Sequence, residues 1–504
     1  MSYSFKKNGW TYIHIEGSPY KRGYDYGRFI VEDLKKMIHT IKYVCMYDYG
    51  KSWNFFINAS NKIFKPTIQI NYPELYEELK GIAAGCKSKG MDTSVDEIIA
   101  WNGSIPLFEY WWPNQEVGKV ITWNTQGLMR KHIRAGGNHR HHHHAGASGR
   151  CSAFIAVGDY TKDGKIVLAH NTFDNFVGGQ NNRYILSIKP NKGARILMQT
   201  TPGYIWSGTD FFVTSHGFIG SETTIGGFLP YKVGNPIFCR IRQAMQYSKS
   251  LGDYEKNLLQ GNTGGYANSW LFGDIHNNEI MRIELGLKYH TTERKKNGYF
   301  IGFNGSYDPR IRNLECRAQG FDDMRRHQGA RHVRLTQLMR KYKGKIDIAI
   351  GKKILADHYD VYLKKINPCS RTVDSHYELD DRAFMSQSDR PKPFQPRGAV
   401  DGKVIDSSIA KKMEFWARWG NSSGMSFNVN KFCDKHIIWE YLRPYLDDRP
   451  SQPWTLFSFD STSTSTSTST PYKHIKSKSK SKSKSKSKSK SKSKSTKKTL
   501  KKRK

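Results

Sequence analysis

The hydrophobic pattern of this chain changes at one position, the junction between Arg150 and Cys151. Before the junction, apolar residues recur every three or four positions over residues 27–49, the spacing of an amphipathic helix. Two more helices are predicted, one beginning at Pro73 and ending near residue 84, the other over residues 94–101. The front of the chain is therefore expected to be mainly helical.

After the junction, short β-rich runs alternate with turn residues, which predicts strands. The expected strands cover residues 152–157, 165–169, 184–188, 196–200, 211–214, 218–221, 269–272, 279–285 and 299–303. Helices are expected at residues 237–248 and 331–342. This order of elements predicts an α+β fold, in which antiparallel sheet packs against helices.

A loose, glycine-rich stretch over residues 136–150 separates the helical front from the cysteine that opens the first of these strands. If the bond after Arg150 is cut, Cys151 carries a thiol with an ordinary pKa of about 8.5 and an α-amine with one of about 8. One residue then supplies both the nucleophile and the general base. From spacing alone the signal is weak, because most cysteines are buried and inert.

Several segments, in this order along the chain, resemble one family. They are residues 17–23 (GSPYKRG), 149–158 (GRCSAFIAVG), 161–164 (TKDG), 169–174 (AHNTFD), 207–212 (SGTDFF), 220–227 (GSETTIGG), 264–270 (GGYANSW) and 418–424 (RWGNSSG). They resemble the acyl-coenzyme A:6-aminopenicillanate acyltransferase family of Ntn hydrolases and its phospholipase B-like relatives. The resemblance covers roughly residues 9 to 455.

The resemblance implies an αββα four-layer sandwich whose precursor is cut into two chains that remain associated. Residues 1–150 would form the helical segment and linker, and residues 151–457 the catalytic domain. From Ser458 to Lys504 the chain consists mainly of Ser-Thr and then Ser-Lys repeats, in which no apolar residue recurs, so a disordered tail is expected.

Four residues take catalytic roles by this resemblance. Cys151 matches the processing site and nucleophile, so the cleavage site would be the bond between Arg150 and Cys151. Asn268 matches the asparagine that stabilises the oxyanion, a role for which a side-chain amide is suited; the alternative is a buried asparagine at a strand end. Asp174 would hold the α-ammonium group. Asn171 shares that role, because the acid falls later than in relatives.

A second set of polar residues is expected to bind substrate. Arg310 and Arg312 could pair with a carboxylate, although surface arginines beside a turn are the alternative. Asp210 and Glu222 would line the pocket or be polar strand ends. His170 could form a Cys-His dyad, but a structural role is favoured, since the α-amine already provides a base.

The seven cysteines are widely spaced and contain no CxxC pair, which argues against a zinc site and against a dense disulfide framework. The run from His141 to His144 could bind a transition metal, but a low-complexity insertion is the favoured interpretation. Neither a metal nor an organic cofactor is expected.

Nearly half of the formal net charge of +37 lies in the last 32 residues of the chain. Seventeen Lys and Arg residues lie between Lys473 and Lys504 without a single acid, so the remainder carries +20. Such a tail predicts salt-dependent, sequence-independent binding to polyanions. The final KKRK could also be a nuclear-import patch, although a solvated charge run is the simpler interpretation.

No apolar segment of signal-peptide type is seen in the first thirty residues, and no run of eighteen apolar residues occurs. A transmembrane helix is therefore not expected, and an intracellular location is favoured, although many phospholipase B-like relatives are lysosomal or secreted.

The preferred hypothesis is a thiol hydrolase or acyltransferase that acts on an amide or ester bond of a small acylated substrate. The first alternative is a phospholipase B-like hydrolase of lipid acyl esters, which the basic body would suit. The second is a non-catalytic structural protein that binds polyanions through its tail. Retention of both Cys151 and Asn268 favours the enzyme.

Overall fold

Two β-sheets form the centre of this structure, a computed structural model that describes residues 1–115, 151–208, 210–317, 320–381 and 393–462. The expected cleavage bond at Arg150, the run from His141 to His144 and residues 463–504 of the tail lie outside the described residues. None of the helices formed by the described residues is long and apolar enough to cross a bilayer.

The larger sheet has nine strands in the order β1-β2-β5-β6-β7-β8-β9-β10-β11. Only β2 and β5 run parallel; the other neighbours are antiparallel. The strands are β1 (Tyr3–Lys7), β2 (Trp10–Gly17), β5 (Tyr184–Pro190), β6 (Ile196–Thr200), β7 (Phe211–Thr214), β8 (Phe218–Thr224), β9 (Asn268–Asp274), β10 (Glu279–Leu285) and β11 (His290–Lys295).

The smaller sheet has the order β12-β3-β4-β16-β17-β18, and a short strand, β15, also pairs with β4. Its strands are β12 (Gly298–Gly302), β3 (Cys151–Val157), β4 (Val167–Asn175), β16 (Asp401–Asp406), β17 (Glu414–Trp419), β18 (Thr455–Ser458) and β15 (Arg397–Ala399). A separate hairpin joins β13 (Tyr359–Asp360) and β14 (Lys365–Ile366).

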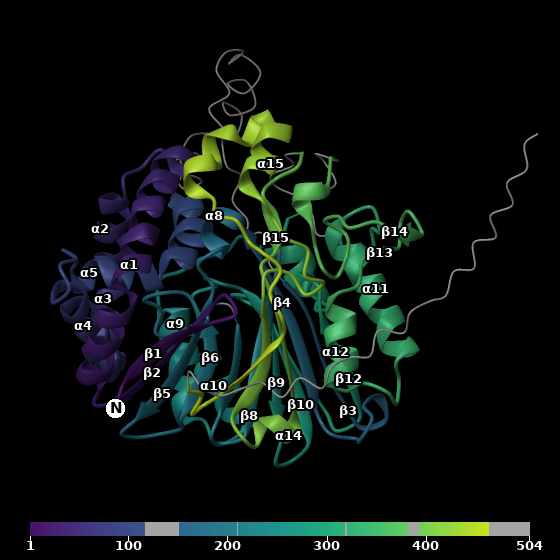
Figure 1. The fold of residues 1–504 in the computed structure, drawn as a ribbon. Helices are drawn as coiled ribbons and strands as arrows, with labels where there is room; N and C mark the ends of the chain where they lie inside the picture. The colour runs from purple at the N-terminus through teal and green to yellow at the C-terminus, as the bar shows by residue number, and fades with distance from the viewer. Residues whose placement is uncertain (116–150, 209, 318–319, 382–392, 463–504) are drawn as a thin grey trace, which may run out of the picture. The chain divides into compact units, whose positions relative to one another are not determined.

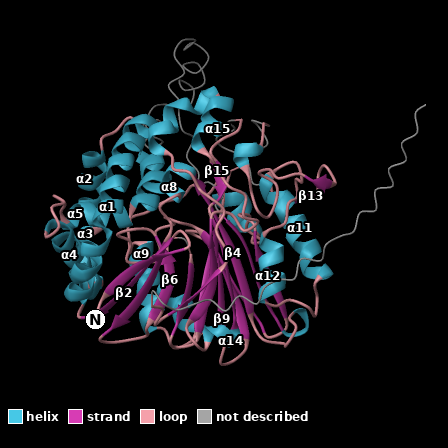
Figure 2. Ribbon diagram, viewed as in Figure 1, coloured by secondary structure: helices cyan, strands magenta, loops and turns pink. Residues whose placement is uncertain are grey.

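The helices lie on both sides of the two sheets (Figures 1 and 2). They are α1 (Pro19–Val44), α2 (Trp53–Ile63), α3 (Lys65–Asn71), α4 (Pro73–Lys87), α5 (Val95–Asn102), α8 (Phe176–Gly179), α9 (Ile237–Tyr247), α10 (Leu251–Leu259), α11 (His327–Lys341), α12 (Ile348–Leu355), α14 (Ser407–Ala410) and α15 (Val429–Lys435). There are three π-helical turns among the described residues: η1 (Cys45–Tyr49) after α1, η2 (Pro106–Trp111) after α5 and η4 (Ile311–Glu315) before α11. Short 3₁₀ segments are η3 (Gly158–Tyr160), η5 (Tyr377–Leu379) and η6 (Ile437–Tyr445).

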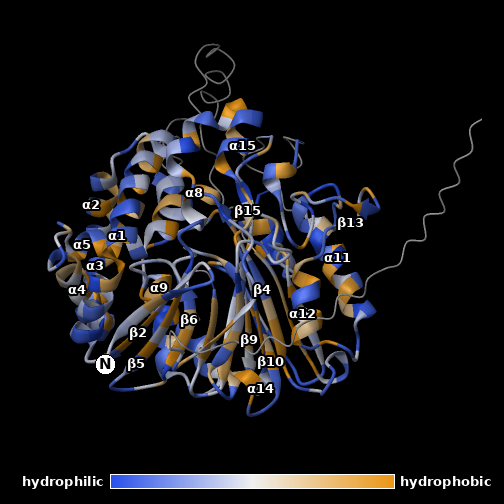
Figure 3. Ribbon diagram, viewed as in Figure 1, coloured by the Kyte–Doolittle hydropathy of each residue, from blue (hydrophilic) through white to orange (hydrophobic). Residues whose placement is uncertain are grey.

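Three apolar cores separate these layers. Between the sheets, Ile155 of β3 belongs to the same buried cluster as Leu271 of β9. Outside the larger sheet, Phe212 of β7 belongs to a cluster with residues of α1, α4, α5, α9 and α10. Outside the smaller sheet, Phe154 of β3 belongs to a cluster with residues of α11 and α12. Figure 3 shows the corresponding hydrophobic segments among the central strands. The order of layers is helix, sheet, sheet, helix, so the predicted αββα fold is confirmed.

Most predicted elements are present at or near their expected bounds. Ser94 accepts a hydrogen bond from the Glu97 amide and caps α5, and Pro73 begins α4 as predicted. The hairpin β1/β2 was not predicted, so the front of the chain is not only helical. At the other end, Phe459 is buried between the sheets beside Phe457, so the core continues past the expected boundary at residue 458.

Helices α1 and α4 cross through glycines that leave no room for side chains. A Cβ atom on Gly27 would lie 2.2 Å from the Ile82 carbonyl oxygen, and one on Gly23 would lie 2.0 Å from that of Glu78. The glycines of the partner helix are as close, since a Cβ on Gly85 would lie 2.1 Å from the Tyr24 carbonyl oxygen. This backbone contact sets the position of α1, whose C-terminal half lines the cavity described below.

Gly27→Ala should therefore lower the free energy of unfolding by about 1–3 kcal/mol, the usual cost of overpacking a tight contact. Thermal and denaturant unfolding would measure it. The matched control is Gly252→Ala in α10, where the nearest heavy atom to a Cβ is 3.5 Å away; there alanine should be neutral or stabilising by up to about 1 kcal/mol. Equal stability of the Gly27→Ala variant and the wild type would contradict the crossing.

Candidate active site

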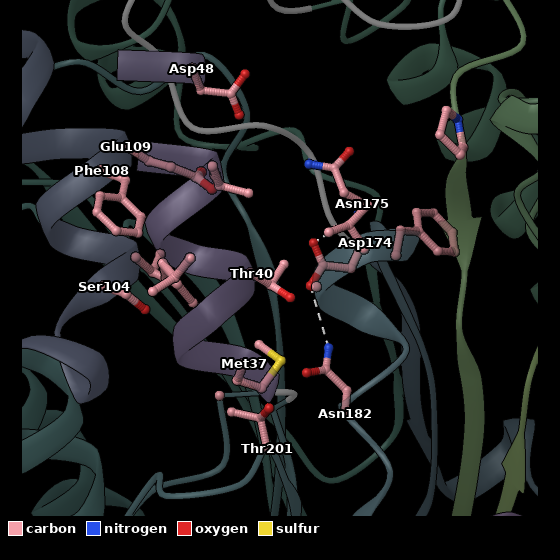
Figure 4. A pocket seen from close by; sticks show the side chains of 18 of the residues that line it. Met37, Thr40, Asp48, Ser104, Phe108, Glu109, Asp174, Asn175, Asn182 and Thr201 are labelled. Atoms are coloured by element: carbon pink, nitrogen blue, oxygen red, sulfur yellow. Dashed lines mark hydrogen bonds between the residues drawn. The ribbon is translucent and has the colours of Figure 1, made fainter. Parts of the chain in front are cut away.

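A cavity of about 520 Å³ reaches Cys151 at the start of β3. Much of its wall is apolar and aromatic and comes from α1, η1, η2 and η6, with Met37, Tyr49, Phe108, Trp439 and Tyr441 among the lining residues. The polar wall includes Thr172, Asp174, Asn182, Asp210 and Tyr266. In Figure 4, Ser104 and Phe108 lie across the cavity from Asp174 and Asn182.

The backbone of Cys151 is held at both its amide and its carbonyl group. Its N–H donates to Asn304 Oδ1 at 3.2 Å, and its carbonyl oxygen accepts from the Arg331 guanidinium. Arg331 also donates to Asn304 Oδ1 at 2.8 Å and to Ser152 Oγ at 3.2 Å. Because one arginine and one asparagine hold both ends of the residue, the direction of the Cys151 side chain is set by α11 and by the chain after β12.

Two buried carboxylates share one tyrosine hydroxyl beside the thiol. The Tyr266 hydroxyl lies 2.6 Å from Asp210 Oδ2 and 2.8 Å from Glu222 Oε1, and Glu222 Oε1 lies 4.0 Å from Cys151 Sγ. A hydroxyl has one proton and can donate to one carboxylate at a time. Asp210 and Tyr266 also have positive φ angles of 59° and 68°, a strained conformation that recurs at functional sites.

These surroundings hold Cys151 in its thiol form in the intact chain. Burial raises the pKa of Cys151 well above its ordinary value, and the negative charges of Glu222 and Asp210 raise it further. Lys403 acts in the opposite direction, since its positive charge lowers this pKa. The Lys403 ammonium donates to Thr172 Oγ1 and to Asp401 Oδ1, both at 2.6 Å, and Thr172 is the cross-strand partner of Cys151.

Asn268 begins β9 and is fully buried. Neither its amide nitrogen nor its amide oxygen has a hydrogen-bond partner among the described residues. Other buried polar atoms on β8 and β9, such as Thr223 Oγ1 and Ser269 Oγ, also lack a partner among the described residues. The cross-strand partner of Asn268 on β8 is Thr224. The Thr224 carbonyl oxygen accepts a hydrogen bond from Asn304 Nδ2 at 2.7 Å, so Asn304 contacts both Cys151 and the strand residue paired with Asn268. Asn268 is not among the described residues that line the cavity.

The two other predicted catalytic residues differ in their surroundings. Asp174 lines the cavity and accepts hydrogen bonds from the Asn175 amide at 2.8 Å and from Asn182 Nδ2 at 3.4 Å. The Asn171 amide donates to the carbonyl oxygens of Leu355 and Val373, and accepts from Ser422 Oγ at 2.6 Å. Asn171 lies outside the described lining of the cavity, and these contacts connect β4 to neighbouring segments.

His170 is buried on β4 and pairs with Ala153 and with Lys403 across the strands. Burial and the charge of Lys403 hold the pKa of His170 well below its ordinary value, so its ring is neutral near pH 7. A neutral ring is compatible with a structural role and with a Cys-His dyad, so the structural role favoured from the sequence stays a prediction.

The two predicted substrate-binding arginines lie elsewhere. Arg310 pairs with Asp308 at 2.7 Å and is about half exposed. Arg312 donates to the carbonyl oxygens of Ser306 and Tyr307 and lies over the Phe321 ring. Neither is among the described residues that line the cavity with Cys151. Of the predicted pocket residues, Asp210 lines the cavity and Glu222 contacts the thiol.

Five residues of this site were not predicted from the sequence: Asn304, Arg331, Tyr266, Lys403 and Asp401. Tyr266 belongs to the quoted GGYANSW segment, and Asp401 and Lys403 are two residues apart, so their side chains lie on one face of a strand. Asn304 and Arg331 carried no pattern that separates them from other polar residues. A separate group of potential metal ligands, His358, Asp374 and His376, is not part of the cavity wall as described.

The chain has distant relatives among proteins of known sequence, but no family model matches it. It is 22% identical over 273 residues to an uncharacterized protein of Archaeoglobus fulgidus, covering 53% of this chain and 42% of the relative. It is 22% identical over 316 residues to phospholipase B-like 2 of Rattus norvegicus, and 20% identical over 313 residues to that of Homo sapiens. In both cases 54% of this chain matches 53% of the relative.

Among solved structures, a variant of the conjugated bile acid hydrolase from Clostridium perfringens matches 53% of this chain and 89% of its own. The TM-score is 0.35 and the sequence identity is 11%. The chain spans about half the length of the curated relatives it matches. The chain is thus distantly similar in sequence to phospholipase B-like 2 proteins, and its described residues form a layered α+β fold.

Proposed function

We propose that this protein is an N-terminal-nucleophile thiol hydrolase or acyltransferase, activated by cleavage of its own chain between Arg150 and Cys151. The observation that carries the proposal is the setting of Cys151. It is the first residue of β3, its amide and carbonyl groups are held by Asn304 and Arg331, and it lines a cavity of about 520 Å³. That volume lies within the range of small-molecule sites.

Cleavage needs one nucleophile and one water molecule. Cys151 Sγ attacks the carbonyl carbon of Arg150, the peptide C–N bond breaks, and the nitrogen takes the thiol proton to become the free α-amine. Water then hydrolyses the thioester, which returns the thiol and leaves a carboxylate on Arg150. The backbone nitrogen of Cys151 already lies 3.2 Å from Asn304 Oδ1. The Asn304 side chain can therefore hold the new α-amine beside the Cys151 thiol.

The same thiol then attacks an acyl substrate. Because burial and two nearby carboxylates raise the pKa of Cys151, a base has to remove the thiol proton at neutral pH, and the α-amine is suited to this role. The acyl group is transferred to Sγ, and the departing amine or alcohol receives the proton. Water or an acceptor amine resolves the acyl-cysteine. We assign the oxyanion role to the Asn268 amide, whose buried nitrogen has no partner among the described residues.

The cavity wall favours an acyl group with a sizeable apolar part. Tyr49, Phe108, Trp439 and Tyr441 contribute aromatic surface from three separate segments. Burial of apolar substrate surface against such a wall contributes about 25 cal/mol per Å². The same wall, together with the names of the distant relatives, supports the second candidate, a phospholipase B-like hydrolase of lipid acyl esters.

Self-cleavage is the first test. Intact-mass measurement and N-terminal sequencing of purified wild-type protein should find fragments 1–150 and 151–504, and Cys151→Ala should remain a single chain. Cys45→Ala is a matched control, because this buried thiol lies outside the described lining of the cavity, and it should be cleaved like the wild type. An uncleaved wild-type protein with full acyl hydrolase activity would contradict the proposed mechanism.

Asn268→Ala should reduce kcat by about 100- to 1000-fold, the effect of losing one oxyanion donor, while leaving Cys151 open to alkylation. Steady-state kinetics on processed protein would measure it. Asn171→Ala is the comparison, since it removes three structural hydrogen bonds and should lower thermal stability more than kcat. A normal kcat in Asn268→Ala would assign the oxyanion hole to other groups.

Glu222→Gln should lower the pKa of Cys151, because it removes a negative charge 4.0 Å from Sγ and keeps an oxygen acceptor for Tyr266. More thiolate is then present at any pH below that pKa, so alkylation by iodoacetamide should be faster at neutral pH. In the pH profile of alkylation, the pH at which the rate of the Glu222→Gln variant is half-maximal should also be lower than in the wild type. Glu414→Gln in β17, outside the described cavity lining, should leave the profile unchanged. A shift of the Glu222→Gln profile to higher pH would refute this electrostatic account.

A further inference from the structure

Three potential metal ligands from two separate segments converge beside helix α12. His358 lies between α12 and β13, and Asp374 and His376 lie between β14 and η5. Their ligand atoms all lie within 4.8 Å of one another. We propose that His358, Asp374 and His376 form a binding site for a divalent transition metal, with Zn²⁺ as the best match.

The distances between the ligand atoms match a tetrahedral zinc site. His358 Nε2 lies 3.1 Å from His376 Nε2 and 3.2 Å from Asp374 Oδ2, and His376 Nε2 lies 3.6 Å from Asp374 Oδ2. With bonds of about 2.0–2.2 Å, neighbouring ligands of a tetrahedral zinc ion lie roughly 3.3–3.5 Å apart. An ion can therefore contact all three atoms with shifts of a few tenths of an ångström, and its fourth position remains for water.

The groups around the ligands are those that orient a metal site. Glu378 Oε1 lies 2.8 Å from His376 Nδ1, so this carboxylate can hold the proton on Nδ1 and direct Nε2 toward the ion. This carboxylate–histidine arrangement is frequent in zinc proteins. Asp374 is oriented in the same way, because the backbone amides of Ser422 and Ser423 donate to its two oxygens at 3.3 and 3.0 Å.

Burial favours a structural ion over a loosely held one. Asp374 and His376 are 0% and 1% exposed, whereas the His358 side chain retains 14% exposure and provides a route from solvent. An ion here would join the end of α12 to the segment before η5. Through Asp374 it would also hold the turn at Ser422, whose hydroxyl donates to Asn171 of β4. We infer a role in holding these segments against the smaller sheet, since none of the three ligands is among the described residues of the cavity wall.

Zinc titration of the full chain tests the site, provided that the histidine run at 141–144 cannot bind the ion. In a background with His141–His144 changed to Asn, chelator-treated protein should bind one equivalent of Zn²⁺ by calorimetry and elemental analysis. Co²⁺ should give the strong visible absorption of tetrahedral coordination. A hundredfold excess of Zn²⁺ over its Kd should raise the unfolding midpoint by on the order of a few degrees.

His376→Ala and His358→Ala should each abolish binding of the one Zn²⁺ equivalent, and Glu378→Gln should raise the Kd for Zn²⁺ about 10- to 100-fold. His290→Asn, an exposed histidine on β11, is the matched control and should bind like the background protein. If His376→Ala does not fold, the more exposed His358→Ala alone decides. Absence of zinc binding in the folded background protein, or an equivalent that survives His358→Ala, would overturn the proposal and leave the cluster as a hydrogen-bonded group.

Discussion

Burial of β3 on both faces is the constraint on which the site depends. Ala153, Ile155 and Val157 belong to the core between the sheets, while Phe154 and Ala156 belong to the core beneath α11 and α12. A shift of this strand by one residue would exchange the two sets and disturb both cores, so its register is strongly specified. Cys151, at the first position of the strand, is thereby held at the end of the intersheet core.

Several buried polar and charged side chains surround that end of the strand. Lys403 and Asp401 form an ion pair next to Thr172, the cross-strand partner of Cys151, and the Tyr266 hydroxyl lies between Asp210 and Glu222. Removing one partner of a buried pair leaves an uncompensated charge, which is strongly destabilising, so these groups constrain one another's positions. The charge of Lys403 lowers the pKa of Cys151, whereas burial and the charges of Glu222 and Asp210 raise it, and the net effect is a pKa well above the ordinary value.

The outer face of β4 is joined to the proposed metal site by hydrogen bonds. Asn171 contacts the carbonyl oxygen of Val373, next to Asp374, and accepts from Ser422, whose amide donates to Asp374. The inner face of the same strand contributes Thr172 beside Cys151. The two faces of this one strand therefore contact the segment around Asp374 and the residues beside Cys151.

The amino-acid sequence alone indicated helices α1, α4 and α5, most strands and the change at Cys151, because hydrophobic periodicity and turn residues are local signals. Helices α2 and α3 were not predicted. The sequence also identified Asp210, Glu222 and Asp174 through quoted segments. Only the tertiary structure decided which polar residues meet. Asn304 and Arg331 reach Cys151 across more than a hundred and fifty positions, and His358 meets His376 because a loop folds back past β13 and β14. The tertiary structure also places Arg310 in an ion pair with Asp308, outside the described wall of the cavity. Such long-range contacts follow from strand pairing and layer packing, which leave no periodic trace in the sequence.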